Sequence, residues 1–240
     1  ATFVIYLFAT SVAILRKRNV AEAAVEAQCA CIGNVGFLGI PMLAMLMGPE
    51  AVLWVMLVLA IDQLVFGSLI VILIVGSRDG RISFGMLKTV GFGLIKNPMI
   101  MAMLAGLLCS SSGVALPTPA AEFFDILGAA ATPGALFAIG ASLASKSAER
   151  ITVAGWLAFC KLILHPGAVA ISALLIFSVA PYPAAVLIAA TALPVAGNIF
   201  ILATHYNVAP TRVSASILVS TVASVVTVSL VIAWVSRLYS

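Results

Sequence analysis

The sequence predicts an all-α polytopic membrane fold, built from two inverted repeats that each contain one broken helix. Of its 240 residues 63% are hydrophobic and 8% are charged, whereas a soluble domain has about 25% charged residues. Apolar stretches long enough to span a bilayer follow one another along the chain. Two of these stretches are interrupted midway by Gly or Pro. The composition excludes soluble enzymes, nucleic-acid-binding proteins and disordered proteins.

The charged residues divide the chain into eight candidate spans of mostly apolar residues, each near the length of about 20 residues that a bilayer requires. We predict these spans at residues 1–15, 20–48, 51–76, 97–112, 118–144, 151–178, 182–205 and 212–236. The stretch 83–96 mixes apolar residues with two lysines and several glycines. This mixture predicts an interfacial helix on the membrane surface.

Lysine and arginine residues occur in every second connection between the spans. They are Arg16, Lys17, Arg18, Arg78, Arg81, Lys88, Lys96, Lys146, Arg150 and Arg212. The intervening turns, near Gly48, Ser110 and Pro181, have none. By the positive-inside rule the basic connections are cytoplasmic, and both ends of this chain face outward.

The two interrupted spans resemble each other. A shift of 161 positions places residues 33–36 on residues 194–197 and Pro49 on Pro210. Each segment is an apolar run with a central break, followed by a turn containing Pro and another long span. The predicted topology orients the two segments in opposite directions, so that the copies are inverted.

The two breaks have a physical consequence in the middle of a membrane. Gly33 and Gly36, like Pro194 and Gly197, weaken helical hydrogen bonding, and the freed backbone groups must be buried or face a water-filled cavity. New helix N-termini near residues 35–37 and 196–198 would favour an anion. Paired, interrupted helices in inverted repeats are typical of the binding site of a secondary transporter. We therefore expect the two helices to cross near Gly33 and Pro194.

These features predict a division of the chain into two repeats. Residues 1–78 would form the last three helices of a first repeat, 79–96 a cytoplasmic interfacial linker, and 97–240 a second repeat of five helices. A symmetric arrangement of ten helices requires two further helices before Ala1, which corresponds to about 60–70 residues.

The residues at both breaks resemble those of the auxin efflux carrier family, which includes plant carriers and bacterial malonate and malate permease-like proteins. The stretch from Gly33 to Pro41 is similar to the family's Asn-Thr-x-x-x-Gly-Ile-Pro motif. The stretch from Ala192 to Pro210 is similar to its Leu-Pro…Ala-x-x-Tyr-Asn-Val-x-Pro motif. Asn97-Pro98 is a weaker third match.

The resemblance implies ten helices, a homodimer built on a scaffold domain, and elevator-type movement of a transport domain in a bacterial inner membrane. The transport domain would comprise 1–78 plus 151–240. The scaffold would comprise 97–144 plus the preceding N-terminal helices.

The resemblance also implies roles for individual residues. Asn34 matches the family's substrate-contacting Asn, and Gln63 and Ser68 fall where plant carriers have a Gln and a Tyr. Gly33 replaces the Pro of the plant carriers, and Ser68 lacks an aromatic ring. These departures favour an anion that is smaller and more polar than an indole compound.

Polar residues within the spans are the remaining candidates, because a charge in mid-bilayer is costly and usually functional. Asp62 could pair with Lys161 or carry a coupling proton. Lys161 and His165 lie one helical turn apart, hence on one face, and could bind a dicarboxylate. Lys161 could instead extend toward the cytoplasmic surface. Glu22 and Glu26 would only complement the helix dipole.

The amides of Asn34 and Asn198 lie beside the two breaks and can donate hydrogen bonds to a carboxylate or to a neighbouring helix. The predicted substrate site comprises Gly33, Asn34, Val35, Gly36, Gln63, Ser68, Pro194, Gly197 and Asn198, with Asp62, Lys161 and His165 for coupling or charge.

The sequence thus predicts a secondary transporter of small organic anions, mono- or dicarboxylates such as malonate or malate, with protons as the candidate coupling ion. A sodium-coupled carrier of the bile-acid symporter type and an anion channel are the alternatives. Nucleotide-binding, zinc-protease and hydrolase motifs are missing from the sequence, and the four cysteines have no metal-type spacing. We therefore expect no enzymatic activity, cofactor or metal, and lipid, substrate and a second copy as partners.

Overall fold

The computed structural model of the chain describes residues 1–79, 88, 91–92, 95, 98–113, 115–144 and 151–239. These residues are predominantly helical, which confirms the predicted all-α membrane fold. Within this part of the chain three helical runs are long and apolar enough to cross a membrane. They are Ala51–Arg78, Ile151–Ile176 and Pro210–Leu238. The interfacial helix predicted over 83–96 lies largely outside the described residues, as do Asn97, Arg81, Lys146 and Arg150.

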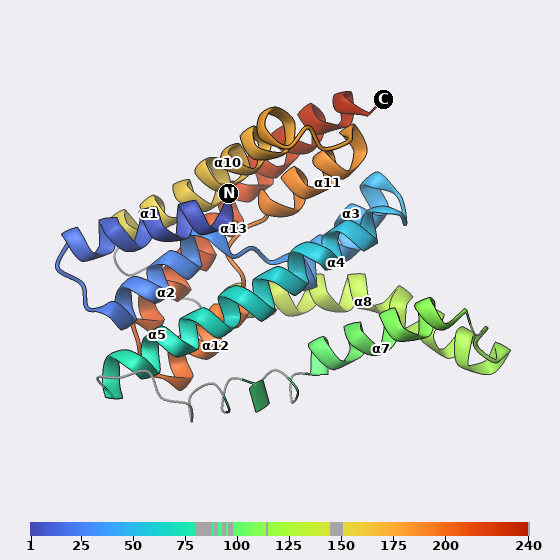
Figure 1. The fold of residues 1–240 in the computed structure, drawn as a ribbon, viewed down its shortest axis with the longest axis horizontal. Helices are drawn as coiled ribbons and strands as arrows, with labels where there is room; N and C mark the ends of the chain where they lie inside the picture. The colour runs from blue at the N-terminus through green and yellow to red at the C-terminus, as the bar shows by residue number, and fades with distance from the viewer. Residues whose placement is uncertain are drawn as a thin grey trace.

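The chain runs through a bundle of helices, several of which contain π-helical turns (Figure 1). In the first half these are α1 (Thr2–Leu15), α2 (Val20–Cys31), η1 (Val35–Gly39), α3 (Ile40–Met47), α4 (Ala51–Ile61), η2 (Asp62–Phe66), α5 (Gly67–Asp79), α7 (Pro98–Ser112) and α8 (Thr118–Ala144). In the second half they are α9 (Ile151–Phe159), η3 (Cys160–Leu164), α10 (His165–Ile171), η4 (Ser172–Ile176), α11 (Pro181–Thr191), α12 (Asn198–His205), α13 (Pro210–Val235) and η5 (Ser236–Leu238).

Local sequence explains where several helices begin and turn. The side chain of Asn19 accepts a hydrogen bond from the Glu22 amide at 2.8 Å and so caps α2. Pro181 and Pro210 stand at the starts of α11 and α13, where a missing N–H costs nothing. Gly48 ends α3 with a φ of 93°, a conformation that glycine adopts without steric cost.

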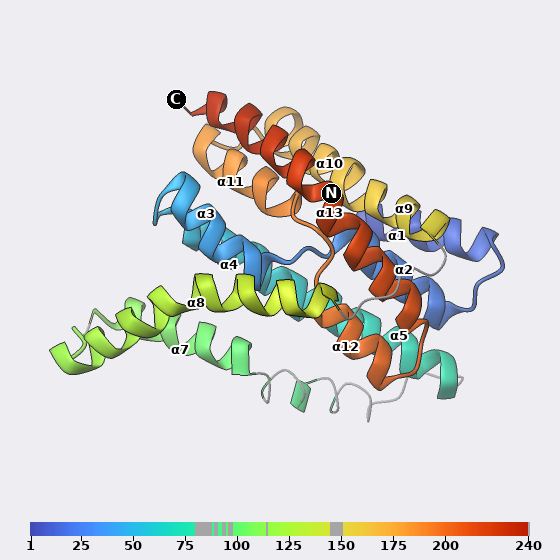
Figure 2. The same cartoon turned by 180° about the vertical axis from the view of Figure 1, so that it is seen from behind.

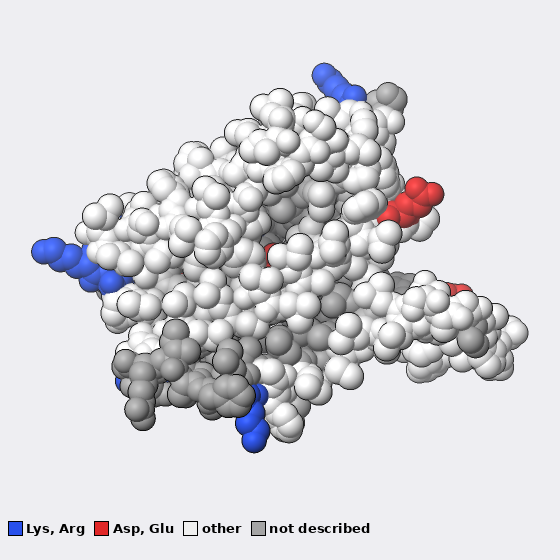
Figure 3. Space-filling view, in the orientation of Figure 1, with Lys and Arg blue, Asp and Glu red and all other residues white. Residues whose placement is uncertain are grey.

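Five basic residues of the described chain lie at one end of the bundle, namely Arg16, Lys17, Arg18, Arg78 and Arg212. The α1–α2 turn, the end of α5 and the α12–α13 turn meet there and line a common pocket that includes Arg18 and Arg78. The α3–α4 turn lies at the opposite end of the bundle, near the C-terminus (Figures 1 and 2). Arg237 lies in η5, near the C-terminus. The face between the two ends is almost free of charged side chains (Figure 3). We call the end where the α1–α2 turn, the end of α5 and the α12–α13 turn meet the basic end.

Two hydrophobic clusters form the core. One packs α1, α2, α5 and α12 toward the basic end. The other packs α3, α4 and α11 with the end of α13. Val195 belongs to the first cluster and Val35 to the second. The two breaks therefore lie where the two clusters adjoin.

Helices α7 and α8 form an arm that extends to one side of the bundle, and α8 returns toward its middle (Figures 1 and 2). There α8 contacts η1 and α3. Many described side chains of the arm, such as Phe123, Phe124 and Ile126, are exposed. An apolar surface of this kind is compatible with lipid.

Candidate functional site

The two broken helices cross, as the sequence predicts. Helix α2 ends at Cys31 and α11 ends at Thr191, and the extended segments that follow them form an antiparallel bridge between Gly33 and Val195. The backbone N–H of Asn34 donates to the Pro194 carbonyl at 2.8 Å, and the backbone N–H of Ala196 donates to the Ile32 carbonyl at 3.1 Å. Each break thus supplies hydrogen-bond partners for the other, which non-helical backbone at this depth requires.

Neighbouring helices hold the crossing from both sides. The Val195 amide donates to Ser220 Oγ of α13 at 3.1 Å. A Cβ atom on Gly33 would lie 3.1 Å from Lys161 Cε and 3.2 Å from Lys161 Nζ. Glycine at position 33 therefore allows the Lys161 side chain to pass directly beside the backbone of the first break.

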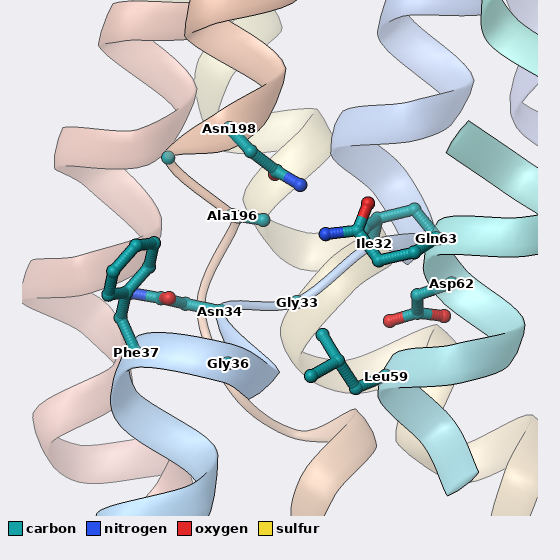
Figure 4. Close-up of a pocket in the computed structure, with 11 residues that line it drawn as sticks. Ile32, Gly33, Asn34, Gly36, Phe37, Leu59, Asp62, Gln63, Ala196 and Asn198 are labelled. Carbon is teal, nitrogen blue, oxygen red and sulfur yellow. The ribbon is translucent and has the colours of Figure 1, made fainter. Parts of the chain in front are cut away.

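A small pocket opens at the crossing and is lined by residues of both breaks and of α4–η2 (Figure 4). We call it the crossing pocket. Its polar or backbone-exposing residues are Gly33, Asn34, Gly36, Asp62, Gln63, Gly197 and Asn198. Its apolar residues are Ile32, Phe37, Leu59 and Ala196. Seven of the residues predicted from the sequence thus lie together around one space.

Two polar groups in the crossing pocket are buried. Asp62 is 7% exposed, and its carboxylate points into the space between Gly33 and Leu59 (Figure 4). Asn198 Oδ1 is buried without a hydrogen-bond partner, and its side chain points toward that of Gln63. A buried polar atom of this kind costs free energy unless a ligand or water completes its hydrogen bonding.

Lys161 and His165 lie behind the crossing and do not line the pocket. Lys161 is 0% exposed, so its side chain does not extend to the cytoplasmic surface. Its ammonium donates to the carbonyl of Thr191, the last residue of α11, and lies 3.4 Å from His165 Nδ1. His165 Nε2 lies 3.0 Å from Thr2 Oγ1. No ion pair within 4.0 Å joins Lys161 to Asp62 among the described residues.

Three other predicted residues lie near the pocket without lining it. Val35 is buried in the second hydrophobic cluster. Pro194 contributes its carbonyl to the crossing. Ser68 is half-buried on α5, beyond Gln63.

Three π-helical turns surround the crossing. In each, the amide that follows the turn donates five residues back: Ile40 to Val35, Gly67 to Asp62, and His165 to Cys160. The first turn, η1, directly follows Asn34. The second, η2, begins at Asp62, and the third, η3, contains Lys161. Single π turns within α-helices occur frequently at functional sites. These turns were not predicted from the sequence.

Sequence reasoning also missed a buried ionic cluster at the basic end, which we call the basic-end cluster. Glu26 is 1% exposed and pairs with both Arg16 and Arg212, the latter at 2.7 Å. Glu22 lies 3.3 Å from Arg212 and 3.6 Å from Arg18. Both glutamates therefore connect arginines of the α1–α2 turn to Arg212 of α13 through ion pairs. The prediction that they only complement the helix dipole understated this role. The missing information was that the α1–α2 turn meets α13.

The described residues include no group of three or more His, Cys, Asp or Glu side chains that could hold a metal ion. The cysteines they contain are free thiols, three of them buried. The polar chemistry of the crossing pocket thus comes from amides, one carboxylate and helix ends.

Comparison with known proteins assigns the chain to a family. A family model described as "Membrane transport protein" matches residues 1–232. The chain is 27% identical over 235 residues to a protein of Rhizobium meliloti (strain 1021) named "Putative malonate transporter", covering 95% of this chain and 72% of that protein. It is 30% identical over 234 residues to the "Uncharacterized transporter YfdV" of Escherichia coli (strain K12), covering 93% of this chain and 71% of that one. The chain belongs to the membrane transport protein family of the auxin efflux carriers, as the motifs at its two breaks indicate.

Proposed function

We propose that this protein is a secondary carrier of small organic anions, mono- or dicarboxylates such as malonate or malate, that works by alternating access. The observation that carries the proposal is that Asn34 and Asn198 both line one pocket, together with the N-terminal ends of η1 and α12. Amide groups donate hydrogen bonds to a carboxylate, and helix N-termini favour negative charge. The name of the Rhizobium meliloti relative supports a dicarboxylate as substrate.

The other lining residues fit a small substrate with a short apolar part. Gln63 would add a further amide contact, and Phe37 and Leu59 supply an apolar wall. Asp62 is the acidic residue of the pocket, and we assign it the coupling proton. Lys161 and His165 do not line the pocket. They would influence the electrostatic potential in the pocket without touching the substrate.

A sodium-coupled carrier is the nearest alternative. A sodium site would require a cage of several oxygen ligands around the cation, as hard cations do. On the side of the crossing away from the pocket, the Thr191 carbonyl already accepts from the Lys161 ammonium. The carboxylate of Asp62 lines the pocket and can carry a proton, so we propose proton coupling and expect transport to be the same in sodium and potassium buffers.

We further propose the arrangement that the family resemblance implies. The chain would contain inverted repeats and work as a homodimer in a bacterial inner membrane. Residues 1–78 and 151–240 would move as a transport domain against a scaffold that includes 97–144. The contact of α8 with η1 and α3 would then be an interface along which the transport domain slides.

Thiol labelling tests the proposed orientation. Ser77 lines the pocket at the basic end and Glu50 precedes α4 in the α3–α4 turn, and both are exposed. The test uses a Cys109→Ser background, because the other three cysteines are buried. In intact cells lacking an outer membrane barrier, an impermeant maleimide should label Glu50→Cys. It should label Ser77→Cys only after the membrane is permeabilised, because basic connections face the cytoplasm. The reverse pattern would invert the topology.

Counterflow in proteoliposomes tests the function. The full-length protein should exchange labelled malonate or malate for internal substrate in a saturable manner, and Asn34→Ala should lose at least about tenfold, the equivalent of one charge-assisted hydrogen bond. Ser229→Ala is the matched control, because Ser229 is exposed and bonds only to its own helix. Flux that is neither saturable nor stimulated by internal substrate would indicate a channel.

A further inference from the structure

We infer that the crossing pocket takes its substrate as a singly charged anion together with one proton on Asp62, so that a dicarboxylate crosses in its half-protonated form. This inference rests on the proposed function of the pocket. It specifies the charge state of the substrate, which determines how pH and membrane potential act on transport.

The first argument is the charge of the residues that line the pocket. They comprise one carboxylate, that of Asp62, and no Lys, Arg or His side chain. Lys161 and His165 are directed to Thr191 and Thr2 on the other side of the crossing. A fully ionised dicarboxylate would place two negative charges beside Asp62 without a cation in contact with them.

The second argument is the charge at the ends of the broken helices. Each helix end is equivalent to about half an elementary charge, positive at the N-terminus and negative at the C-terminus. The N-terminal ends of the run η1–α3 and of α12 together contribute about one positive charge, and the C-terminal ends of α2 and α11 about one negative charge. Lys161 lies at the C-terminal end of α11, and its positive charge offsets that of the two C-terminal ends.

The site is therefore close to neutral when it is empty and Asp62 is ionised, because the Asp62 charge then balances that of the two N-terminal ends. An arriving monoanion disturbs this balance by one negative charge, and a proton on Asp62 restores it. A dianion would leave one further charge uncompensated in mid-membrane, which is strongly disfavoured.

The groups that surround Asp62 leave it as the proton acceptor. Two titratable groups on the elements packed around Asp62 interact electrostatically with its carboxylate. They are Lys161 of η3 and the Cys31 thiol of α2. Lys161 is held by the Thr191 carbonyl, and the Cys31 thiol donates to the Ala27 carbonyl. The Asp62 carboxylate is the titratable group among them that lines the pocket.

The first test uses malonamate, in which a neutral amide replaces one carboxyl group of malonate, so that it is a monoanion at every working pH. The full-length protein in proteoliposomes should take up malonamate in response to an inward proton gradient. An imposed membrane potential should have no effect, because a monoanion and a proton carry no net charge. At pH 8 malonamate should inhibit labelled malonate uptake at concentrations at least tenfold lower than unlabelled malonate does.

The variant Asp62→Asn supplies the second readout. It removes the proton acceptor and retains the side chain's size, so counterflow of malonamate should persist while net uptake no longer follows the proton gradient. Uptake should instead follow an inside-positive potential, because the anion then moves without a proton. Ser229→Ala should behave like the unmodified protein in every arm.

The outcomes separate this inference from the proposed function. Saturable malonate exchange that is inhibited by malonate at pH 8 and not by malonamate would overturn the monoanion inference and keep the carrier. A proton-gradient response that Asp62→Asn retains would overturn the role of Asp62. The absence of saturable exchange for any carboxylate, in a preparation that unfolds cooperatively, would overturn the proposed function itself. If Asp62→Asn does not fold, the malonamate competition in the unmodified protein decides the inference alone.

Discussion

The basic-end cluster and the crossing pocket are both buried and polar, but their charges are arranged differently. At the basic end both carboxylate oxygens of Glu26 are bound, one by Arg16 and one by Arg212. At the crossing, Asp62 lines a pocket and has no ion pair within 4.0 Å among the described residues, and Asn198 Oδ1 lacks a hydrogen-bond partner. A cluster whose charges are bound stabilises the fold, whereas one whose polar groups are left available can bind a ligand.

The largest expected difference is between Glu26→Gln and Asp62→Asn. Removal of the Glu26 charge leaves Arg16 and Arg212 without their buried counter-ion, and we expect a loss of about 3 kcal/mol in the free energy of unfolding. Asp62→Asn should change it by less than about 1 kcal/mol. Unfolding in a titration with denaturing detergent measures both. Equal losses would show that the two clusters do not differ as described.

Glycine substitutions sharpen the description of the crossing itself. Gly33→Ala places a methyl group 3.1 Å from Lys161 Cε, so the buried lysine side chain must shift by a few tenths of an ångström. We expect a loss of about 1–3 kcal/mol, which is usual for overpacking. Gly197→Ala is the control, because nothing lies within 4 Å of its added Cβ. If both variants were equally stable, Lys161 would not lie against the first break.

The Ser220 side chain offers a finer test of how α13 supports the crossing. Ser220→Ala leaves the buried Val195 amide without its acceptor and should cost about 1–2 kcal/mol of stability. Ser224→Ala should cost less, because Ser224 Oγ bonds only to the Thr221 carbonyl of its own helix. The same detergent titration applies, and a larger effect at Ser224 would contradict the contact between Ser220 and Val195.

The smallest expected effect on stability is that of Asn198→Ala, because its Oδ1 has no protein partner to lose. Stability should change by no more than about 0.5 kcal/mol, while counterflow of malonate should fall strongly. Asn198→Ala thus resembles Asn34→Ala in function and is unlike Glu26→Gln in stability. A variant that unfolds and keeps its transport activity per folded molecule would mean that Asn198 is structural.

The sequence predicted the crossing because Gly and Pro at matching positions are local signals. Gly33 and Pro194 weaken helical hydrogen bonding at matching positions of two apolar spans, and this pairing indicates a break in each. Asn34, Asn198 and Asp62 were candidates because a polar residue in an apolar span is conspicuous. These signals name Asn34, Asp62 and Asn198 of the crossing pocket in advance, and the family resemblance adds Gln63.

Other features depend on distant contacts or lack a sequence signal. Phe37 and Leu59 are apolar residues among many, and only their position beside the crossing distinguishes them. The partner of Lys161 is a backbone carbonyl of another helix, which no residue type indicates. The pairing of Glu26 with Arg212 requires that α2 and α13 meet at the basic end.

Substrate protection tests the central claim, that an organic anion binds at the crossing of the two broken helices. Phe37 lines the pocket and is exposed, so a cysteine at that position is accessible and leaves both asparagine amides in place. Phe37→Cys and Ser77→Cys, each in a Cys109→Ser background because the other three cysteines are buried, would be labelled with a maleimide at increasing malonate or malonamate concentrations. We expect substrate to slow labelling at position 37, saturably and at the concentrations that support counterflow by the same variant, and to leave position 77 unaffected. Labelling at position 37 that ignores a substrate which the variant exchanges would place the binding site elsewhere.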